Sequence, residues 1–255
     1  MSMSTNKIAL VTGGSRGLGR NMALRIAEKG LDVILTYHSN KEAANGVVQA
    51  IEQLGQKAVA FQLDTSDTNG FEVFFKKVSD YLSKAYNRNT FDYLINNAGT
   101  GIYKPFLETT EDDFDEMMNI HIKGVYFLSQ QAVPLLSDGG GIINISSGLA
   151  RFTLPGSSAY ASMKGAVEVF TKYLAKELSS RKIRANVVAP GAVATDFGGG
   201  ENKENDKKRA LISQNTALGR VGEPEDIGGI VAFLCTEDAR WINGQRIEAS
   251  GGIML

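Results

Sequence analysis

Short runs of β-branched and apolar residues alternate with longer amphipathic segments along the whole chain. The runs predicted as strands are Ile8–Val11, Asp32–Thr36, Lys57–Gln62, Phe91–Ile95, Gly141–Ser146, Arg184–Val188 and Gln245–Glu248. The segments predicted as helices are Gly17–Lys29, Lys41–Gln53, Asp67–Lys84, Thr110–Leu136, Ser157–Lys182 and Glu225–Leu234. Strands that alternate with helices indicate βαβ units, and hence a parallel sheet with helices on both faces. No repeat or linker divides residues 1–255, so we predict one doubly wound α/β domain of about seven strands.

Composition narrows the classes of partner and compartment. Lys and Arg total 27 against 28 Asp and Glu, and a net charge of −1 argues against a nucleic-acid or anionic-membrane partner. The single cysteine, Cys235, excludes an internal disulfide. The longest apolar run, Ile230–Cys235, is far too short to span a membrane, and Met1–Asn6 has no signal-peptide pattern. These features predict a soluble, cytoplasmic protein.

A glycine-rich turn follows the first predicted strand. Ile8–Thr12 runs into Gly13-Gly-Ser-Arg-Gly17-Leu-Gly19, and a helical pattern begins at once. Glycines allow the backbone to approach a pyrophosphate closely, and the helix N-terminus offers unpaired N–H groups and a positive dipole end. A glycine turn alone is weak evidence, but its position between a strand and a helix predicts a dinucleotide site. The predicted cofactor-binding residues here are Gly13, Ser15, Arg16, Gly17, Leu18 and Gly19.

The end of the second strand predicts which dinucleotide binds. An acidic residue that would bind a free ribose 2′-hydroxyl is expected about 20 residues after the glycine turn, but Leu35–Lys41 contains no carboxylate. Groups that suit a 2′-phosphate lie nearby: Arg16, His38, Ser39 and Lys41. We therefore expect NADP(H), with Tyr37, His38 and Ser39 at the nucleotide. The alternative is that Tyr37 and His38 are ordinary strand-end residues and that NAD(H) is also accepted.

Candidate acid–base chemistry lies in the segment Ser157–Lys182. Tyr160 and Lys164 are four residues apart and share one face of the predicted helix. A free phenol has a pKa of about 10, and a neighbouring ammonium is expected to lower it. Ser147, at the end of the strand Gly141–Ser146, can hold a substrate carbonyl beside the phenol. Alone, this spacing also fits a surface helix pair; the separate dinucleotide site favours the catalytic interpretation.

Together these motifs resemble the short-chain dehydrogenase/reductase superfamily, from Lys7 to Gly252. The resemblance implies a Rossmann-type fold and interconversion of a carbonyl and a secondary alcohol by hydride transfer. Ser147 would orient the carbonyl, Tyr160 would act as general acid or base, and Lys164 would lower the phenol pKa and hold the nicotinamide ribose. Within the superfamily the chain is most similar to 3-oxoacyl-carrier-protein reductases and to sugar or polyol dehydrogenases, and the sequence does not decide between them.

Further cofactor contacts are implied by the resemblance alone. Asp64 corresponds to the family's adenine contact, Asn96–Gly99 lines the cofactor cleft, and Pro190–Thr195 meets the nicotinamide carboxamide. In the last segment Val193 would contribute backbone and Thr195 a hydroxyl. The implied set is Asp64, Asn97, Ala98, Gly99, Tyr160, Lys164, Pro190, Gly191, Val193 and Thr195.

One position departs from the family pattern. Alignment of Ile122–Phe127 with the family's motif puts His121 where an asparagine is usual. Asn119 is two residues away, so it does not share that face unless the helix is irregular. In the family the backbone carbonyl of this position holds a water that passes protons to the lysine, so we expect activity to persist. His121 is itself a catalytic candidate because imidazole titrates near neutral pH; the alternative is a packed, neutral histidine. With His38 and His121 as its only histidines, the chain gives no plausible zinc site.

Two expectations concern the larger architecture. Residues 195–218 are predicted to form a substrate lid hinged at Phe197–Gly200, although Lys203–Arg209 also reads as a solvated segment. The resemblance implies a homotetramer, or a homodimer, built by pairing the helices Thr110–Leu136 and Ser157–Lys182. The competing hypothesis is a dinucleotide-binding sensor or scaffold with weak catalysis, motivated by His121. The intact catalytic trio favours an enzyme with a small carbonyl or alcohol substrate.

Overall fold

The computed structural model describes residues 6–255 and contains a single seven-stranded sheet in which all neighbouring strands are parallel. The strand order is β3-β2-β1-β4-β5-β6-β7. The strands are β1 (Ile8–Val11), β2 (Asp32–Tyr37), β3 (Ala58–Gln62), β4 (Phe91–Asn96), β5 (Leu136–Ile145), β6 (Arg184–Pro190) and β7 (Arg246–Ala249). The absence of a signal-peptide pattern was predicted from Met1–Asn6, most of which lies outside the described residues.

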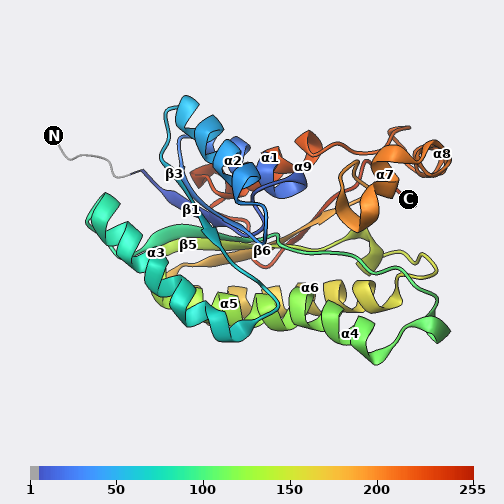
Figure 1. The fold of residues 1–255 in the computed structure, drawn as a ribbon, viewed down its shortest axis with the longest axis horizontal. Coiled ribbons are helices and arrows are strands. Elements are labelled where there is room, and N and C mark those ends of the chain that lie inside the picture. Colours follow the sequence, from blue (N-terminus) through green and yellow to red (C-terminus); the bar gives the residue numbers. More distant parts are fainter. Residues whose placement is uncertain (1–5) are drawn as a thin grey trace.

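Helices cover both faces of the sheet (Figure 1). They are α1 (Gly17–Glu28), α2 (Lys41–Gln53), α3 (Phe71–Tyr86), α4 (Glu111–Met118), α5 (Gly124–Ala132), α6 (Ser158–Glu177), α7 (Glu201–Glu204), α8 (Asp206–Gln214) and α9 (Glu225–Leu234). One apolar core lies between the sheet and α1, α2 and α9, and a second lies between the sheet and α3, α5 and α6. Strands β1, β2, β4 and β6 are buried throughout, as expected of strands covered on both sides. The doubly wound α/β prediction is confirmed.

The predicted helix Thr110–Leu136 is wrong as a single element. It is divided into α4, a π-helical turn (Asn119–Lys123), α5 and a 3₁₀ turn (Val133–Leu135), and Leu136 already belongs to β5. Gly124 packs directly against the Thr65 carbonyl, 2.0 Å from where a Cβ would stand, so a tertiary contact sits at the irregular turn. The periodicity of the sequence does not report such a contact.

Two other predicted segments also differ in the structure. Helix α6 ends at Glu177 and is followed by a 3₁₀ turn (Ser179–Arg181), which ends at Lys182 in a left-handed conformation (φ 55°). The segment 195–218 contains α7, α8 and a turn at Phe197–Gly200, and Figure 1 shows both helices beyond the sheet at the end near the C-terminus. Among residues 6–255, no helix combines the length and apolar character needed to cross a bilayer.

Candidate active site

The glycine turn after β1 is built by close backbone contacts. Gly13 has φ +64°, and a Cβ on it would lie 2.9 Å from the Ala98 Cα. A Cβ on Gly19 would lie 2.1 Å from the Gly13 carbonyl oxygen. Only glycine fits at either position, so the turn is held directly against the residues that follow β4.

Thr12 joins this turn to the end of β4, a role that the sequence motifs did not reveal. Its Oγ1 accepts hydrogen bonds from the backbone N–H groups of Asn97 (2.9 Å) and Ala98 (3.0 Å). The Asn97 side chain in turn donates to the Thr12 carbonyl at 2.9 Å. The first helix has no side-chain cap and no acidic residue in its first turn, and Arg16 at its N-cap is exposed. The turn, the uncapped helix and Arg16 therefore fit a dinucleotide pyrophosphate.

The residues predicted at the nucleotide end come together at the edge formed by β2 and β3. Tyr37 is buried at the end of β2, whereas His38 and Ser39 are exposed. His38 Nε2 lies 3.6 Å from Asp64 Oδ2, and Asp64 Oδ1 accepts hydrogen bonds from the N–H and hydroxyl of Ser66. The predicted ribose and adenine residues are thus neighbours.

The predicted catalytic trio lies at the carboxyl edge of the sheet. Ser147 lies two residues after the end of β5, and its Oγ accepts a hydrogen bond from the Leu149 N–H at 3.2 Å. Tyr160 and Lys164, on α6, are 7% and 6% exposed. The Lys164 ammonium donates to the Ile145 carbonyl at 2.7 Å and lies 5.5 Å from the centroid of the Tyr160 ring. Burial lowers the pKa of Lys164 to about 7.

The expected lowering of the phenol pKa by Lys164 is wrong for this geometry. Burial, and secondarily Tyr103, raise the pKa of Tyr160, against a smaller lowering by the Ser147 side chain. The physical reason is desolvation: burial disfavours the phenolate, while the Lys164 ammonium is bonded to the Ile145 carbonyl. Tyr160 is therefore held as a neutral acid.

His121 lies in the π-helical turn and is buried beside Tyr160. Its ring meets the Tyr160 ring edge-on, with centroids 5.0 Å apart. Its Nε2 is 2.7 Å from the Thr100 carbonyl, which can only accept, so the proton is on Nε2. Burial, and then the charge of Lys164, hold the pKa of His121 well below its usual value, so the imidazole is neutral. Its Nδ1 has no hydrogen-bond partner within residues 6–255. The helix irregularity on which a role for Asn119 depended is present.

A buried series of hydrogen-bonded amides and hydroxyls connects the strands and helices that carry the catalytic trio, and it was not predicted. Asn96 Nδ2 donates to Ser129 Oγ (2.9 Å) and to Asn144 Oδ1 (2.7 Å). Asn144 Nδ2 donates to Thr171 Oγ1 at 2.9 Å. These bonds tie β4, α5, β5 and α6 together. Asparagines inside the apolar runs of β4 and β5 were the available signal.

The segment after β6 lies between the glycine turn and β7. A Cβ on Gly191 would lie 2.8 Å from the Ser250 Cα, so only glycine permits this approach. Val193 pairs with Gly222, and Thr195 Oγ1 accepts from the Phe197 N–H at 3.3 Å. A Cβ on Gly17 would stand 3.6 Å from the Thr195 Cβ, so the predicted pyrophosphate and carboxamide residues face one another.

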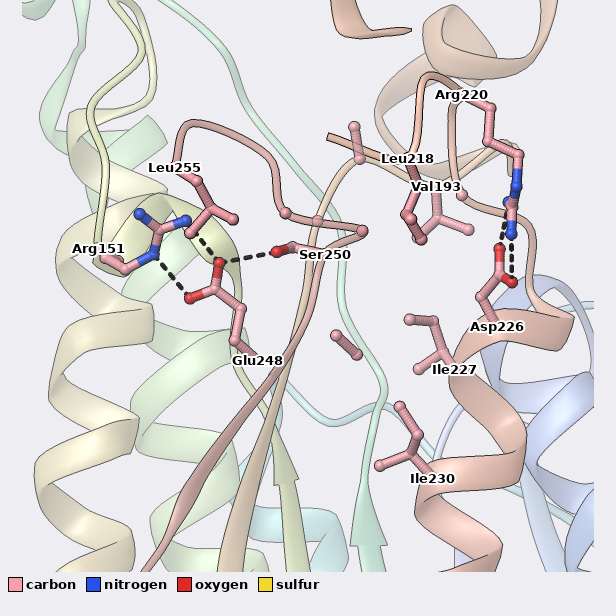
Figure 2. A pocket seen from close by; sticks show the side chains of 16 residues that line it. Arg151, Val193, Leu218, Arg220, Asp226, Ile227, Ile230, Glu248, Ser250 and Leu255 are labelled. Atoms are coloured by element: carbon pink, nitrogen blue, oxygen red, sulfur yellow. Dashed lines mark hydrogen bonds and ion pairs between the residues drawn. The ribbon is translucent and has the colours of Figure 1, made fainter. Parts of the chain in front are cut away.

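A cavity of about 570 Å³ lies on the other side of this segment, at the ends of β6 and β7. Figure 2 shows two ion pairs on opposite sides of it, Arg151–Glu248 and Arg220–Asp226, with Ile227 and Ile230 of α9 below. Tyr160 does not line this cavity.

Behind Ser147 runs a continuous series of ion pairs. Arg246 binds Glu168 of α6 and Glu248 of β7, each at 2.7 Å, and donates to the Ser147 carbonyl at 3.3 Å. Arg151 binds Glu248 at 2.6 Å and donates to the carbonyls of Ile253 and Met254. Hydrogen bonds from Arg151, partly offset by burial, lower the pKa of Glu248 to about 2. We call Glu168, Arg246, Glu248 and Arg151 the charged network.

Comparison with known proteins places this geometry in a family. The family model described as enoyl-(acyl carrier protein) reductase matches residues 13–254. The chain is 36% identical over 260 residues to a hydroxynaphthalene reductase-like protein, Arp2, of Metarhizium brunneum, covering 96% of this chain and 94% of that protein.

Two solved structures are similar over nearly their whole length. The promiscuous reductase LugOII, which catalyses keto-reduction at C1 during lugdunomycin biosynthesis, has a TM-score of 0.93 and 38% identity, with 100% of both chains covered. The landomycin C-6 ketoreductase LanV, with bound NADP and rabelomycin, has a TM-score of 0.89 and 37% identity, covering 98% of this chain and 97% of that one. The fold, the glycine turn and these similarities together establish that the chain belongs to the short-chain dehydrogenase/reductase superfamily and is an oxidoreductase.

Proposed function

We propose that this chain reduces a ketone to a secondary alcohol with NADPH, with Tyr160 as the general acid. The observation that carries the proposal is the shared position of Ser147, Tyr160 and Lys164 at the carboxyl edge of the sheet, the same edge as the glycine turn. The activities of LugOII and LanV, both reductions of ketones, support it.

The reaction adds a hydride to the carbonyl carbon and a proton to its oxygen. The bound dinucleotide supplies the hydride. Ser147 orients and polarises the carbonyl, and the neutral Tyr160 phenol donates the proton. Lys164, 5.5 Å from the centroid of the Tyr160 ring, is proposed to return a proton to the phenolate rather than to lower the phenol pKa. Its pKa of about 7 lets Lys164 exchange protons at neutral pH, so the phenol can be reprotonated.

NADPH is proposed over NADH because of the exposed hydrogen-bonding side chains at the end of β2 and the nearby cation of Arg16. His38 and Ser39 are exposed there, Arg16 is exposed at the start of α1, and Leu35–Lys41 carries no carboxylate to repel a 2′-phosphate. LanV, which binds NADP, supports this preference. Tighter binding of NADH than of NADPH in a titration would contradict it. The other predicted cofactor residues, including Asp64, remain proposed contacts.

The decisive experiment follows NADPH consumption by the native protein and by Tyr160→Phe with a panel of ketones, aldehydes and quinones. Removal of a general acid is expected to slow turnover about 10² to 10⁴-fold while NADPH binding is kept. An enoyl thioester belongs in the panel because of the name of the matching family model. If the native protein binds NADPH and turns over nothing, the sensor or scaffold alternative is correct. Equal turnover by both proteins would remove Tyr160 from the mechanism.

We further propose the lid and the assembly. Residues 195–218 would close over the substrate, since Thr195 at their start faces the glycine turn. A homotetramer or homodimer through α4, α5 and α6 would cover apolar side chains that are exposed on these helices: Phe114, Tyr126, Phe127, Val169 and Tyr173. Gel filtration that gives only a 27.5 kDa species would contradict the assembly. A cytoplasmic location stays a prediction from the sequence.

A further inference from the structure

The general acid proposed above lies beneath two further aromatic rings. The centroid of the Tyr160 ring is 5.9 Å from that of Phe197, at an interplanar angle of 58°, and 6.2 Å from that of Tyr103, at 55°. Phe197 is 36% and Tyr103 44% exposed, whereas Tyr160 is 7% exposed. Phe197 and Tyr103 thus present one side to solvent and the other to the reacting phenol.

Glycines hold these two rings close together. A Cβ on Gly101 would lie 2.9 Å from Phe197 Cε1 and 3.0 Å from Tyr103 Cε2, so any side chain there would push the rings apart. A Cβ on Gly198 would lie 2.8 Å from Tyr103 Cε2. Gly198, Gly199 and Gly200 have φ values of 60°, 85° and 79°, so the backbone next to Phe197 is built from conformations that glycine adopts freely.

The rings lie on an apolar cluster, and the charged side chains next to them in sequence are paired. Tyr160 packs in a small apolar cluster with Met117 and Met163, bordered by Ile102 and Leu149. Lys104, next to Tyr103, is paired with Asp113 at 2.8 Å. Asp196, next to Phe197, is paired with Lys203 at 2.9 Å. A substrate carboxylate or phosphate would have to compete with Asp113 or Asp196 for these two cations, while a flat apolar ring would find two aromatic side chains beside Tyr160.

We propose that Tyr103 and Phe197 form an aromatic clamp that selects ketones whose carbonyl is fused to a planar aromatic ring. The inference rests on the proposed reductase function and names the substrate class of the same site. The two rings part to admit the substrate and pack on its faces, while the carbonyl reaches Tyr160 and Ser147. Offset or tilted aromatic contacts add to the burial of apolar area, so the clamp discriminates by stacking. The class excludes small aliphatic ketones and sugars as preferred substrates.

The test compares two ketones that differ only by a fused benzene ring: α-tetralone and cyclohexanone. For the native protein with NADPH, kcat/KM is expected to be at least about tenfold higher for tetralone. In Phe197→Leu and Tyr103→Leu this ratio falls toward one, because the stacking partner is lost. Tyr103→Phe keeps the ring and is expected to keep the ratio. Phe106→Leu is the matched control, since Phe106 is 77% exposed and lies outside the clamp.

The outcomes separate the clamp from the reductase function. Equal kcat/KM for the two ketones in the native protein, or an unchanged ratio in Phe197→Leu, would overturn the clamp and leave the reductase standing. No turnover of any ketone in the panel would overturn the reductase itself. Melting temperature and NADPH binding of each variant identify misfolding; if the leucine variants misfold, Tyr103→Phe and Phe197→Tyr decide, since loss of the ratio in both would contradict the clamp.

Discussion

The polar groups on the two sides of Ser147 differ in how completely their charges and hydrogen bonds are compensated. On the side of Tyr160 the groups are buried without full compensation: Lys164 has a pKa of about 7, and the His121 Nδ1 has no partner within residues 6–255. On the other side, the charged network pairs each guanidinium with a carboxylate and adds bonds to backbone carbonyls. On the first side burial shifts the pKa values, whereas in the charged network the pKa of Glu248 is lowered mainly by its hydrogen bonds from Arg151.

This difference makes the charged network a positioning device. Arg246 reaches the Ser147 carbonyl, and its partner Glu168 accepts a hydrogen bond from Ser146 Oγ at 2.7 Å. Glu168 lies one turn after Lys164 on α6. The network therefore connects the serine, the lysine helix and β7 without contacting the reacting atoms.

Among changes outside the catalytic trio, the largest effect is expected from Arg246→Met. Loss of the guanidinium leaves Glu168 and Glu248 facing each other and releases the Ser147 carbonyl, and a misplacement near 1 Å can cost about a hundredfold in rate. We expect kcat to fall about tenfold to a hundredfold with NADPH affinity unchanged, and Arg246→Lys to recover part of the loss. In a Ser147→Ala background the same change is expected to have little further effect. A full loss in that background would show that Arg246 does not act through Ser147.

A smaller effect is expected in how stability depends on pH. Unfolded Lys164 keeps its proton up to about its ordinary pKa of 10.5, whereas folded Lys164 loses it near 7. Between these values the unfolded chain binds more protons, so the free energy of unfolding rises with pH, by at most about 1.4 kcal/mol per unit. Urea unfolding at pH 7.5 and 8.5 is expected to show this rise in the native protein and not in Lys164→Met. Both pH values lie below the ordinary pKa of Cys235 (9.0), so that the cysteine contributes little to the change. An equal change in the free energy of unfolding of both proteins would contradict this assignment to Lys164.

The smallest effect is expected at the ion pair across the cavity from Arg151. Arg220 and Asp226 are 2.6 Å apart, but their side chains are 52% and 37% exposed. Exposed pairs contribute little because water screens them, so Arg220→Gln is expected to change the free energy of unfolding by less than about 1 kcal/mol. Asp226 also keeps its bond from the Glu223 N–H. A loss of several kcal/mol in the free energy of unfolding, or a fall in kcat as large as that of Arg246→Met, would contradict the contrast between this pair and the charged network.

Local sequence patterns were sufficient to predict the strands, the turn and the helix spacing that carry the site. The glycine turn, strand β1, strands β4 and β6 to within two residues of their ends, and the spacing of Tyr160 and Lys164 were all predicted, because glycine conformations and hydrophobic periodicity act over a few residues. The break in the predicted helix Thr110–Leu136 was not predicted, because it coincides with the contact between Gly124 and Thr65.

Tertiary structure decided the pKa values of the site, the ion pairs behind it and the aromatic side chains beside Tyr160. Arg246 and Glu168 are 78 residues apart, and Tyr103 and Phe197 meet only because the loops after β4 and β6 end at one edge of the sheet. The shift in the pKa of Tyr160 was predicted in the wrong direction. Spacing along a helix indicates proximity to Lys164 but not the loss of water around the phenol. The sequence by itself determined the fold, the family and the candidate residues through local patterns; the packing of distant segments alone decided their protonation, their support and what covers them.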